Sequence, residues 1–145
     1  MNRSQRLQPV HDLADETERD CALRVASAQQ RHTDAQRRHG DLERYLGEYR
    51  QMFQQRASTG MGVSGLRDYQ AFIARLTEAV RQQQQQVQQS AQECEAALAR
   101  WREAATRKAA VGTVIARAQV EDRRIEDRRI QNELDERAQR WVSTR

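Results

Sequence analysis

The sequence predicts an all-α protein: two long helices that form an elongated antiparallel coiled-coil hairpin, with the second helix longer and overhanging. Apolar residues recur every seven positions in both halves of the chain, which is typical of coiled coils. One short segment rich in glycine, serine and threonine separates the halves and indicates a reversal. Only 37% of the 145 residues are hydrophobic and 32% are charged, so the composition suits one narrow apolar stripe per helix rather than a compact core.

The first predicted helix covers about residues 7–56. Seven-residue spacing defines its seam, which consists of Leu7, Ala14, Cys21, Ala28, Ala35, Leu42 and Tyr49. A companion stripe consists of Val10, Thr17, Val25, His32, His39, Leu46 and Phe53. Because proline has no amide hydrogen, Pro9 fits best in the first turn of a helix, where that hydrogen is not needed. The helix is therefore expected to begin near Leu7.

The predicted turn is the segment 57–65, ASTGMGVSG, which holds three of the six glycines. Glycine permits the backbone conformations that a tight reversal requires. Ser64 lies just before the next apolar position, Leu66. Since a serine hydroxyl can accept a hydrogen bond from a free amide at a helix N-terminus, we expect Ser64 to cap the second helix.

The second predicted helix covers about residues 66–141. One stripe of its seam consists of Leu66, Ile73, Val80, Val87, Cys94 and Trp101. The other consists of Tyr69, Leu76, Gln83, Ser90, Ala97, Ala104, Val111, Ala118 and Ile125. The glutamine run 82–86 lies between Val80 and Val87, which keep the register, so it is interpreted as helix with a polar layer in the seam.

The two helices differ in length, which predicts an overhang. Antiparallel pairing that sets Phe53 opposite Tyr69 also sets Leu7 opposite about Ile115, so residues of about 116–145 have no partner in the hairpin. Large or small apolar residues are isolated among charges in this segment, namely Ile125, Ile130, Leu134, Ala138 and Trp141. An unpaired helix of this kind is marginal alone and tends to dock on another protein. A frayed, solvated end is the alternative.

No group of residues predicts catalysis. His32 and His39 are seven residues apart, whereas two metal ligands on one helix are usually four apart, and no glycine-rich segment carries the Lys-Ser/Thr of a phosphate-binding loop. The register separates Cys21 from Cys94 by about one heptad, which is too far for a disulfide. We therefore expect two reduced, packed thiols, no enzyme activity, no cofactor and no metal.

Charge and hydropathy limit the kinds of partner that the sequence predicts. The formal net charge is +4, from 25 basic and 21 acidic residues that are interleaved along the chain, and this is not typical of a nucleic-acid-binding surface. No apolar run reaches the roughly 18 residues of a membrane-spanning helix, and residues 1–10 lack the apolar core of a signal peptide. These features predict a cytoplasmic chain with no transmembrane segment and no nucleic-acid partner.

A second stripe runs beside the seam, close to the turn. Its members are Phe72, Leu76, Ala79 and Gln83. Phe72 directly precedes the seam residue Ile73, so its side chain points about 100° away from the seam. An exposed apolar stripe is a candidate protein-binding face. The alternative is that Phe72 folds over the turn and covers Met52 or Met61.

Several segments resemble those of the FliJ family, whose members are small components of the flagellar type III export apparatus. They are RLQPVHDLA at 6–14, YLGEYRQMFQ at 45–54, LRDYQAFIARLTEAV at 66–80, WREAATRK at 101–108 and ELDERAQRW at 133–141. The segments beside the turn are the most specific, because heptads alone occur in many proteins. Together the segments cover almost the whole chain.

The resemblance implies a cytoplasmic antiparallel coiled coil, similar to the central stalk of rotary ATPases. Such a protein binds the hexamer of the export ATPase FliI, promotes its assembly and activity, and links it to the export gate FlhA and to flagellar export chaperones. It is peripherally associated with the inner-membrane flagellar basal body. A generic helical-hairpin adaptor or chaperone without an ATPase partner is the alternative function.

The resemblance also implies which residues bind. The gate contact is carried over to Phe72, Leu76, Ala79 and Gln83, although some relatives have histidine where this chain has Gln83. The contact with the ATPase or chaperones is assigned to the end of the hairpin that holds both termini. Its candidate residues are Leu7, Val10, Ile125, Ile130, Leu134 and Trp141.

Overall fold

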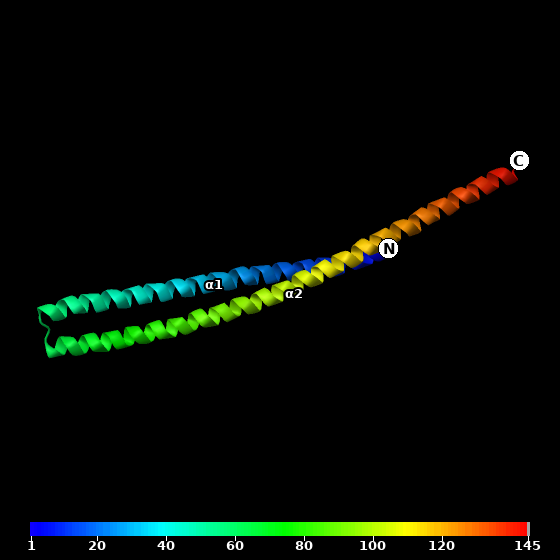
Figure 1. Ribbon diagram of the computed structural model, residues 1–145. Coiled ribbons are helices and arrows are strands. Elements are labelled where there is room, and N and C mark those ends of the chain that lie inside the picture. Colours follow the sequence, from blue (N-terminus) through cyan, green and yellow to red (C-terminus); the bar gives the residue numbers. More distant parts are fainter. Residues whose placement is uncertain (145) are drawn as a thin grey trace. The chain divides into compact units, whose positions relative to one another are not determined.

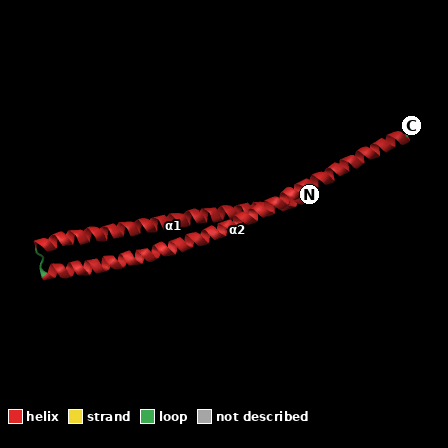
Figure 2. Ribbon diagram, in the orientation of Figure 1, coloured by secondary structure: helices red, strands yellow, loops and turns green. Residues whose placement is uncertain are grey.

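The computed structural model describes residues 1–144. Two α-helices account for nearly all of them, α1 (Arg3–Thr59) and α2 (Val63–Ser143), and Figure 1 shows them as two coiled ribbons joined by a short loop. In Figure 2 the same residues are red for helix apart from that loop and the chain ends, and the described residues contain no strand. The predicted all-α helical hairpin is confirmed.

The chain divides into two compact units. The turn unit, residues 22–100, contains the second part of α1, the loop and the first part of α2. The terminal unit, residues 1–21 and 101–145, contains the first part of α1 and the remainder of α2. In each unit the two helices pack against each other in antiparallel directions.

Helix α1 begins at Arg3, four residues before the predicted start at Leu7. The backbone N–H of Gln5 donates to Asn2 Oδ1 over 2.9 Å, and the backbone N–H of Asn2 donates to Gln5 Oε1 over 3.2 Å. This reciprocal pair is a capping box, which satisfies two amides at the helix start. Pro9 therefore lies inside the helix, and not in its first turn.

The loop between the helices consists of only three residues, 60–62, and not the nine of the predicted turn. Gly60 has φ of +96°, a left-handed conformation that favours glycine and commonly ends a helix. The carbonyl of Gly62 accepts a hydrogen bond from the amide of Leu66 over 3.0 Å. Helix α2 therefore starts at Val63, and Ser64, expected as its cap, lies within the first turn.

The core of the turn unit is a thin seam. Its buried apolar residues are Ala28, Ala35, Leu46 and Leu76. The rings of Phe53 and Tyr69 stack with centroids 3.7 Å apart, as the predicted register requires. His32 Nδ1 and Ser90 Oγ are hydrogen-bonded over 2.9 Å. In both pairs the residue numbers total 122, so the register that was predicted at the turn holds further along the unit.

Polar side chains also occupy this seam. Gln83 Nε2 donates to the carbonyl of Ala35 over 3.0 Å. The hydroxyl of Ser90 donates to the carbonyl of Val87 over 2.9 Å, so His32 Nδ1 is the donor to Ser90 Oγ. Hydrogen bonds satisfy these part-buried groups and thereby remove the cost of placing them between the helices.

In the terminal unit the pairing of the helices extends further than predicted. Ala14, Ala104, Ile115 and Ala118 are buried, Ala118 with only 2% of its surface exposed. The amide of Ser4 donates to Asp122 Oδ2 over 3.1 Å. Helix α1 starts four residues earlier than expected, and Ser4 pairs with Asp122 where the register of the turn unit would place residue 118. Helix α2 therefore has a partner up to Asp122, and an overhang beginning at about 116 is wrong. Every described residue from 123 to 144 is exposed; we call this segment the tail.

Three further features of the described residues bear on the expectations from sequence. Cys21 and Cys94 are both free, half-buried thiols. Within residues 1–144 no helix has both the length and the apolar character needed to cross a membrane. In the same range no three His, Cys, Asp or Glu side chains are grouped so that they could hold a metal ion.

Candidate docking surfaces

Aromatic side chains from both helices gather beside the loop of the turn unit. We call them the ring cluster, which consists of Tyr45, Tyr49, Phe53, Tyr69 and Phe72. The ring of Tyr49 lies 4.8 Å from that of Tyr45 and 4.6 Å from that of Phe72, centroid to centroid. Tyr45 and Tyr49 are one turn apart on α1, and the antiparallel register brings Phe72 of α2 opposite Tyr49.

A shallow groove of about 580 Å³ lies on this unit, next to the ring cluster. Phe72 is half-buried and lines the groove together with Met52 and Met61. Phe72 therefore packs on a ring of α1 and still borders an open surface. A Cβ atom at Gly65 would lie 3.2 Å from Met61 Cγ, so the glycine leaves room for the Met61 side chain against the helix.

The other members of the predicted gate stripe lie in the seam or at its edge. Leu76 is only 8% exposed and belongs to the core. Ala79 and Gln83 are half-buried, and Gln83 donates to the carbonyl of Ala35 on α1. The structure thus brings the four residues to one side of α2, but only Phe72 of them borders the groove.

The predicted docking residues of α1 lie in the terminal unit. Leu7 is half-buried, whereas Val10 is 50% exposed. Val10 and Leu13 line a groove of about 110 Å³ together with Ala104 and Val111 of α2. Leu13 is 65% exposed, although its position is outside both seam stripes and the sequence pattern did not select it.

The predicted docking residues of α2 lie on the tail and are all exposed, namely Ile125, Ile130, Leu134 and Trp141. They do not share one face. Nine residues separate Ile125 from Leu134, which is about two and a half helical turns, so these two side chains point in opposite directions. Ile130, Leu134 and Trp141 follow one another at spacings of four and seven residues and lie on the same face.

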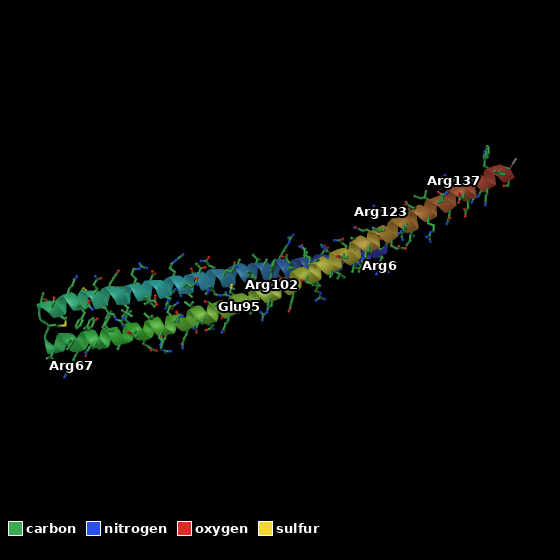
Figure 3. All side chains as sticks on the ribbon, viewed as in Figure 1. Arg6, Arg67, Glu95, Arg102, Arg123 and Arg137 are labelled. Atoms are coloured by element: carbon green, nitrogen blue, oxygen red, sulfur yellow. The ribbon has the colours of Figure 1, made fainter. Side chains whose placement is uncertain are left out.

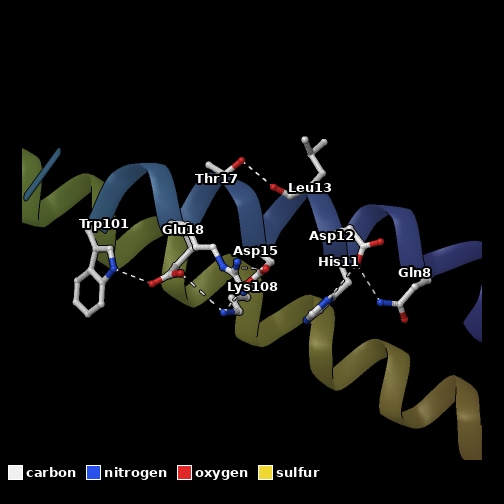
Figure 4. A network of polar contacts seen from close by, with 10 residues as sticks. Gln8, His11, Asp12, Leu13, Asp15, Thr17, Glu18, Trp101 and Lys108 are labelled. Carbon is white, nitrogen blue, oxygen red and sulfur yellow. Dashed lines mark hydrogen bonds and ion pairs between the residues drawn. The ribbon is translucent and has the colours of Figure 1, made fainter. Parts of the chain in front are cut away.

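A polar network crosses between the helices of the terminal unit (Figure 4). Lys108 Nζ lies 2.7 Å from Asp15 Oδ1 and 3.8 Å from Glu18 Oε2. The indole N–H of Trp101 donates to Glu18 Oε1 over 2.9 Å. Arg19 adds an ion pair to Asp15 within α1 at 3.2 Å. These contacts join α1 to α2 at defined positions and so fix the register of the unit.

The sequence of this chain was compared with protein families, curated proteins and solved structures. The family model described as flagellar FliJ protein matches residues 3–145 of this chain. The chain belongs to the FliJ family. The match covers essentially the whole chain and confirms the resemblance found in the sequence segments, so this FliJ protein is a flagellar export component. No curated protein and no solved structure gave a match.

Sequence reasoning missed part of the surface of this FliJ chain. Tyr49 and Tyr69 were assigned to the seam only, and Tyr45 was not assigned a role. The signal was present in the four-residue spacing of the two tyrosines on α1 and in the register that sets Tyr49 opposite Phe72. The Lys108 network was also missed, since all its charged members lie outside the apolar stripes.

The ion pair between Asp15 and Lys108 makes the stability of this FliJ chain depend on pH. The hydrogen bond from Lys108 lowers the pKa of Asp15 below its ordinary 3.8, and the same bond raises the pKa of Lys108 above its ordinary 10.5. The contribution of Asp15 to stability is present above pH 3.8 and is lost as the pH falls through the lowered pKa. The contribution of Lys108 to stability is present below pH 10.5 and is lost as the pH rises through the raised pKa.

We therefore expect the native chain to melt at a higher temperature than Lys108→Gln near neutral pH, with the difference shrinking below pH 3.8 and above pH 10.5. Circular dichroism melts across the pH range measure this difference. Arg102→Gln, at an exposed position of the same helix, is the matched control. A constant gap between the native chain and Lys108→Gln at every pH would contradict the assignment.

Proposed function

We propose that this FliJ chain binds the hexamer of the export ATPase FliI through its terminal unit, as a central stalk-like subunit, and promotes assembly and turnover of the ring. Family membership supports a role in flagellar export. The main support for the ATPase contact is the structure of the tail. It continues as helix to Ser143 although every residue from 123 to 144 is exposed. An exposed helix with large apolar side chains gains stability when another protein covers it.

The chemistry of the tail fits a binding role better than a purely solvated one. Ile130 and Leu134 are 45% and 53% exposed. They lie one turn apart, so they form a continuous apolar patch, and Trp141 lies two turns beyond Leu134 on the same face. Burial of large aliphatic side chains in an interface contributes favourable binding free energy, and tryptophan is among the residues that contribute most.

A single chain in the pore of a six-fold ring contacts the six subunits unequally. It therefore stabilises some subunit conformations more than others, which is the requirement for shifting their populations. Binding to several subunits at once also favours the assembled ring over free subunits by mass action. No catalytic group of its own is needed for either effect.

We propose further that the turn unit contacts the export gate FlhA, and that FliJ also meets flagellar export chaperones. The ring cluster and its groove support a protein partner, because aromatic rings and methionines are enriched in interface cores and Met side chains adapt to the shape of a partner. The chain would then act in the cytoplasm and reach the inner-membrane basal body peripherally, through the gate.

Purified FliI tests the ATPase part of this proposal. Adding the FliJ chain is expected to raise both the fraction of FliI sedimenting as hexamer and the rate of ATP hydrolysis. An unrelated two-stranded coiled coil at the same concentration is the control. Unchanged assembly and turnover, with FlhA binding intact, would favour the adaptor without an ATPase partner.

A further inference from the structure

The exposed face of the tail repeats with the spacing of a coiled-coil seam. Positions three and four residues apart follow one another along it without a break, and they are Arg123, Asp127, Ile130, Leu134, Arg137, Trp141 and Thr144. We call this row the tail seam. Each of its members is exposed. The tail seam thus has the geometry for a second helix, and α1 lies near only its first member, Arg123, which lines a groove together with Asn2 and Arg6.

The charges of the tail seam are not used within the helix. Arg124, Arg129 and Arg140 form ion pairs with glutamates one turn away, at 4.0, 2.8 and 3.6 Å. Asp127 and Arg137 take part in none of these ion pairs. In Figure 3 the labelled Arg123 and Arg137 both lie on this part of α2; Arg6 of α1 is labelled beside Arg123, whereas no helix runs beside α2 at Arg137. The seam charges are therefore available to a partner.

The order of residues along the tail seam is self-complementary when two copies run antiparallel. If Ile130 faces Leu134 of a second copy, Asp127 faces Arg137 of that copy. The next layer places Arg123 opposite Trp141, a cation beside an aromatic ring. By symmetry each contact occurs twice. Flanking the seam, Glu126 comes next to Arg140 of the other copy, which is a further pair of opposite charge.

Other arrangements of two tails are unfavourable. A parallel pair sets Arg123, Asp127 and Arg137 each opposite its own copy, so every charged layer is repulsive. Sliding the antiparallel pair by one heptad in either direction places Leu134 opposite an arginine. One like-charge contact, Glu133 with its own copy, remains in the favoured register, and Arg129 lies 3.3 Å from Glu133 and reduces it.

We propose that the tail binds a second copy of this chain, as a short antiparallel coiled coil centred between Ile130 and Leu134. Only two layers of the contact are wholly aliphatic, so the interface is small and the dimer is weak. It covers the same side chains that the proposed ATPase contact uses, and the two modes of binding exclude each other. Self-association is nevertheless a property of the chain alone and does not depend on the ATPase.

Sedimentation equilibrium of the full chain tests the proposal without any partner. We expect a reversible monomer–dimer equilibrium with a dissociation constant between about 10 µM and 1 mM, as for other small interfaces. Asp127→Arg and Arg137→Asp are each expected to weaken the dimer about tenfold, because two attractive layers become repulsive. The double variant Asp127→Arg with Arg137→Asp restores attraction in both layers and is expected to dimerise like the native chain.

Mixing the two single variants supplies a second readout. One copy then carries arginine and the other aspartate at both positions, so a mixture is expected to dimerise more strongly than either variant alone. Asp135→Arg and Arg128→Asp make the same charge changes on another face of the helix and are the matched controls. Helix content by circular dichroism shows that each variant is folded.

Two results would overturn the proposal. One is a chain that stays monomeric at millimolar concentration. The other is a dimer that both single variants leave unchanged, since this places the contact elsewhere on the molecule. Recovery in the double variant supports the antiparallel register, because in a parallel pair the double variant keeps like charges opposite each other.

Discussion

A chain that ends after Asp122 is expected to lose all stimulation of FliI while its paired helices stay folded. The tail carries none of the buried residues of the terminal unit, and the hydrogen bond from Ser4 to Asp122 still joins the two helices in the truncated chain. Removing exposed residues costs little stability, whereas it removes every tail residue proposed to meet the ATPase. ATP hydrolysis by FliI, measured with native and truncated chains at equal concentration, gives the result directly.

A shorter truncation provides the matched control. A chain that ends after Trp141 keeps Ile130, Leu134 and the tryptophan and is expected to stimulate FliI like the native chain. Melting curves establish that both truncated chains are folded. Full stimulation by the chain that ends after Asp122 would move the ATPase contact to α1, where Val10 and Leu13 border a groove.

The sequence was sufficient to predict the fold and, in the turn unit, the register, because both depend on periodicity. Seven-residue spacing in two halves leaves an antiparallel pairing as the simplest way to bury both stripes. Phe53 and Tyr69 were predicted to face each other at the turn, and their rings stack. A large aromatic on each helix, just before and just after the only glycine-rich segment, was the information that set this register.

The ends of the helices were predicted less well, since they depend on hydrogen bonds between particular side chains and amides. Asn2 and Gln5 form a capping box, but Pro9 was given more weight, and the predicted start at Leu7 was four residues late. The error propagated. A later start of α1 leaves more of α2 without a partner, so the overhang was expected at 116 although Ala118 is buried.

The composition of the surface was only partly predictable from the pattern. Heptad spacing showed that Leu76 belongs to a seam stripe, yet it also fits the stripe of Phe72, and spacing alone does not say which of the two governs its burial. The Lys108 network depends on how long side chains bend across from one helix to the other. Spacing does not fix those side-chain conformations, so the network becomes visible only in three dimensions.

Phe72 borders the groove, whereas Leu76 is buried in the seam. This difference in burial leads to the second large expected effect. Phe72→Ala is expected to weaken binding of FlhA by about 2 kcal/mol, roughly 30-fold in the dissociation constant, since it removes an aromatic ring from the border of a groove. Stability is expected to fall by only about 1 kcal/mol, because the half-buried ring loses one aromatic contact, that with Tyr49. Isothermal titration calorimetry measures the binding, and urea denaturation followed by circular dichroism measures the stability.

Leu76→Ala is expected to show the reverse balance. Leu76 is buried in the seam, and removal of a buried leucine side chain costs about 2–3 kcal/mol of stability, whereas its direct contribution to a partner contact is small. Val63→Ala, at an exposed position close to the loop, is the matched control and is expected to change neither quantity by much. If Phe72→Ala instead lowered stability as much as Leu76→Ala and left FlhA binding unchanged, Phe72 would be a core residue, and the gate contact would have to involve other side chains.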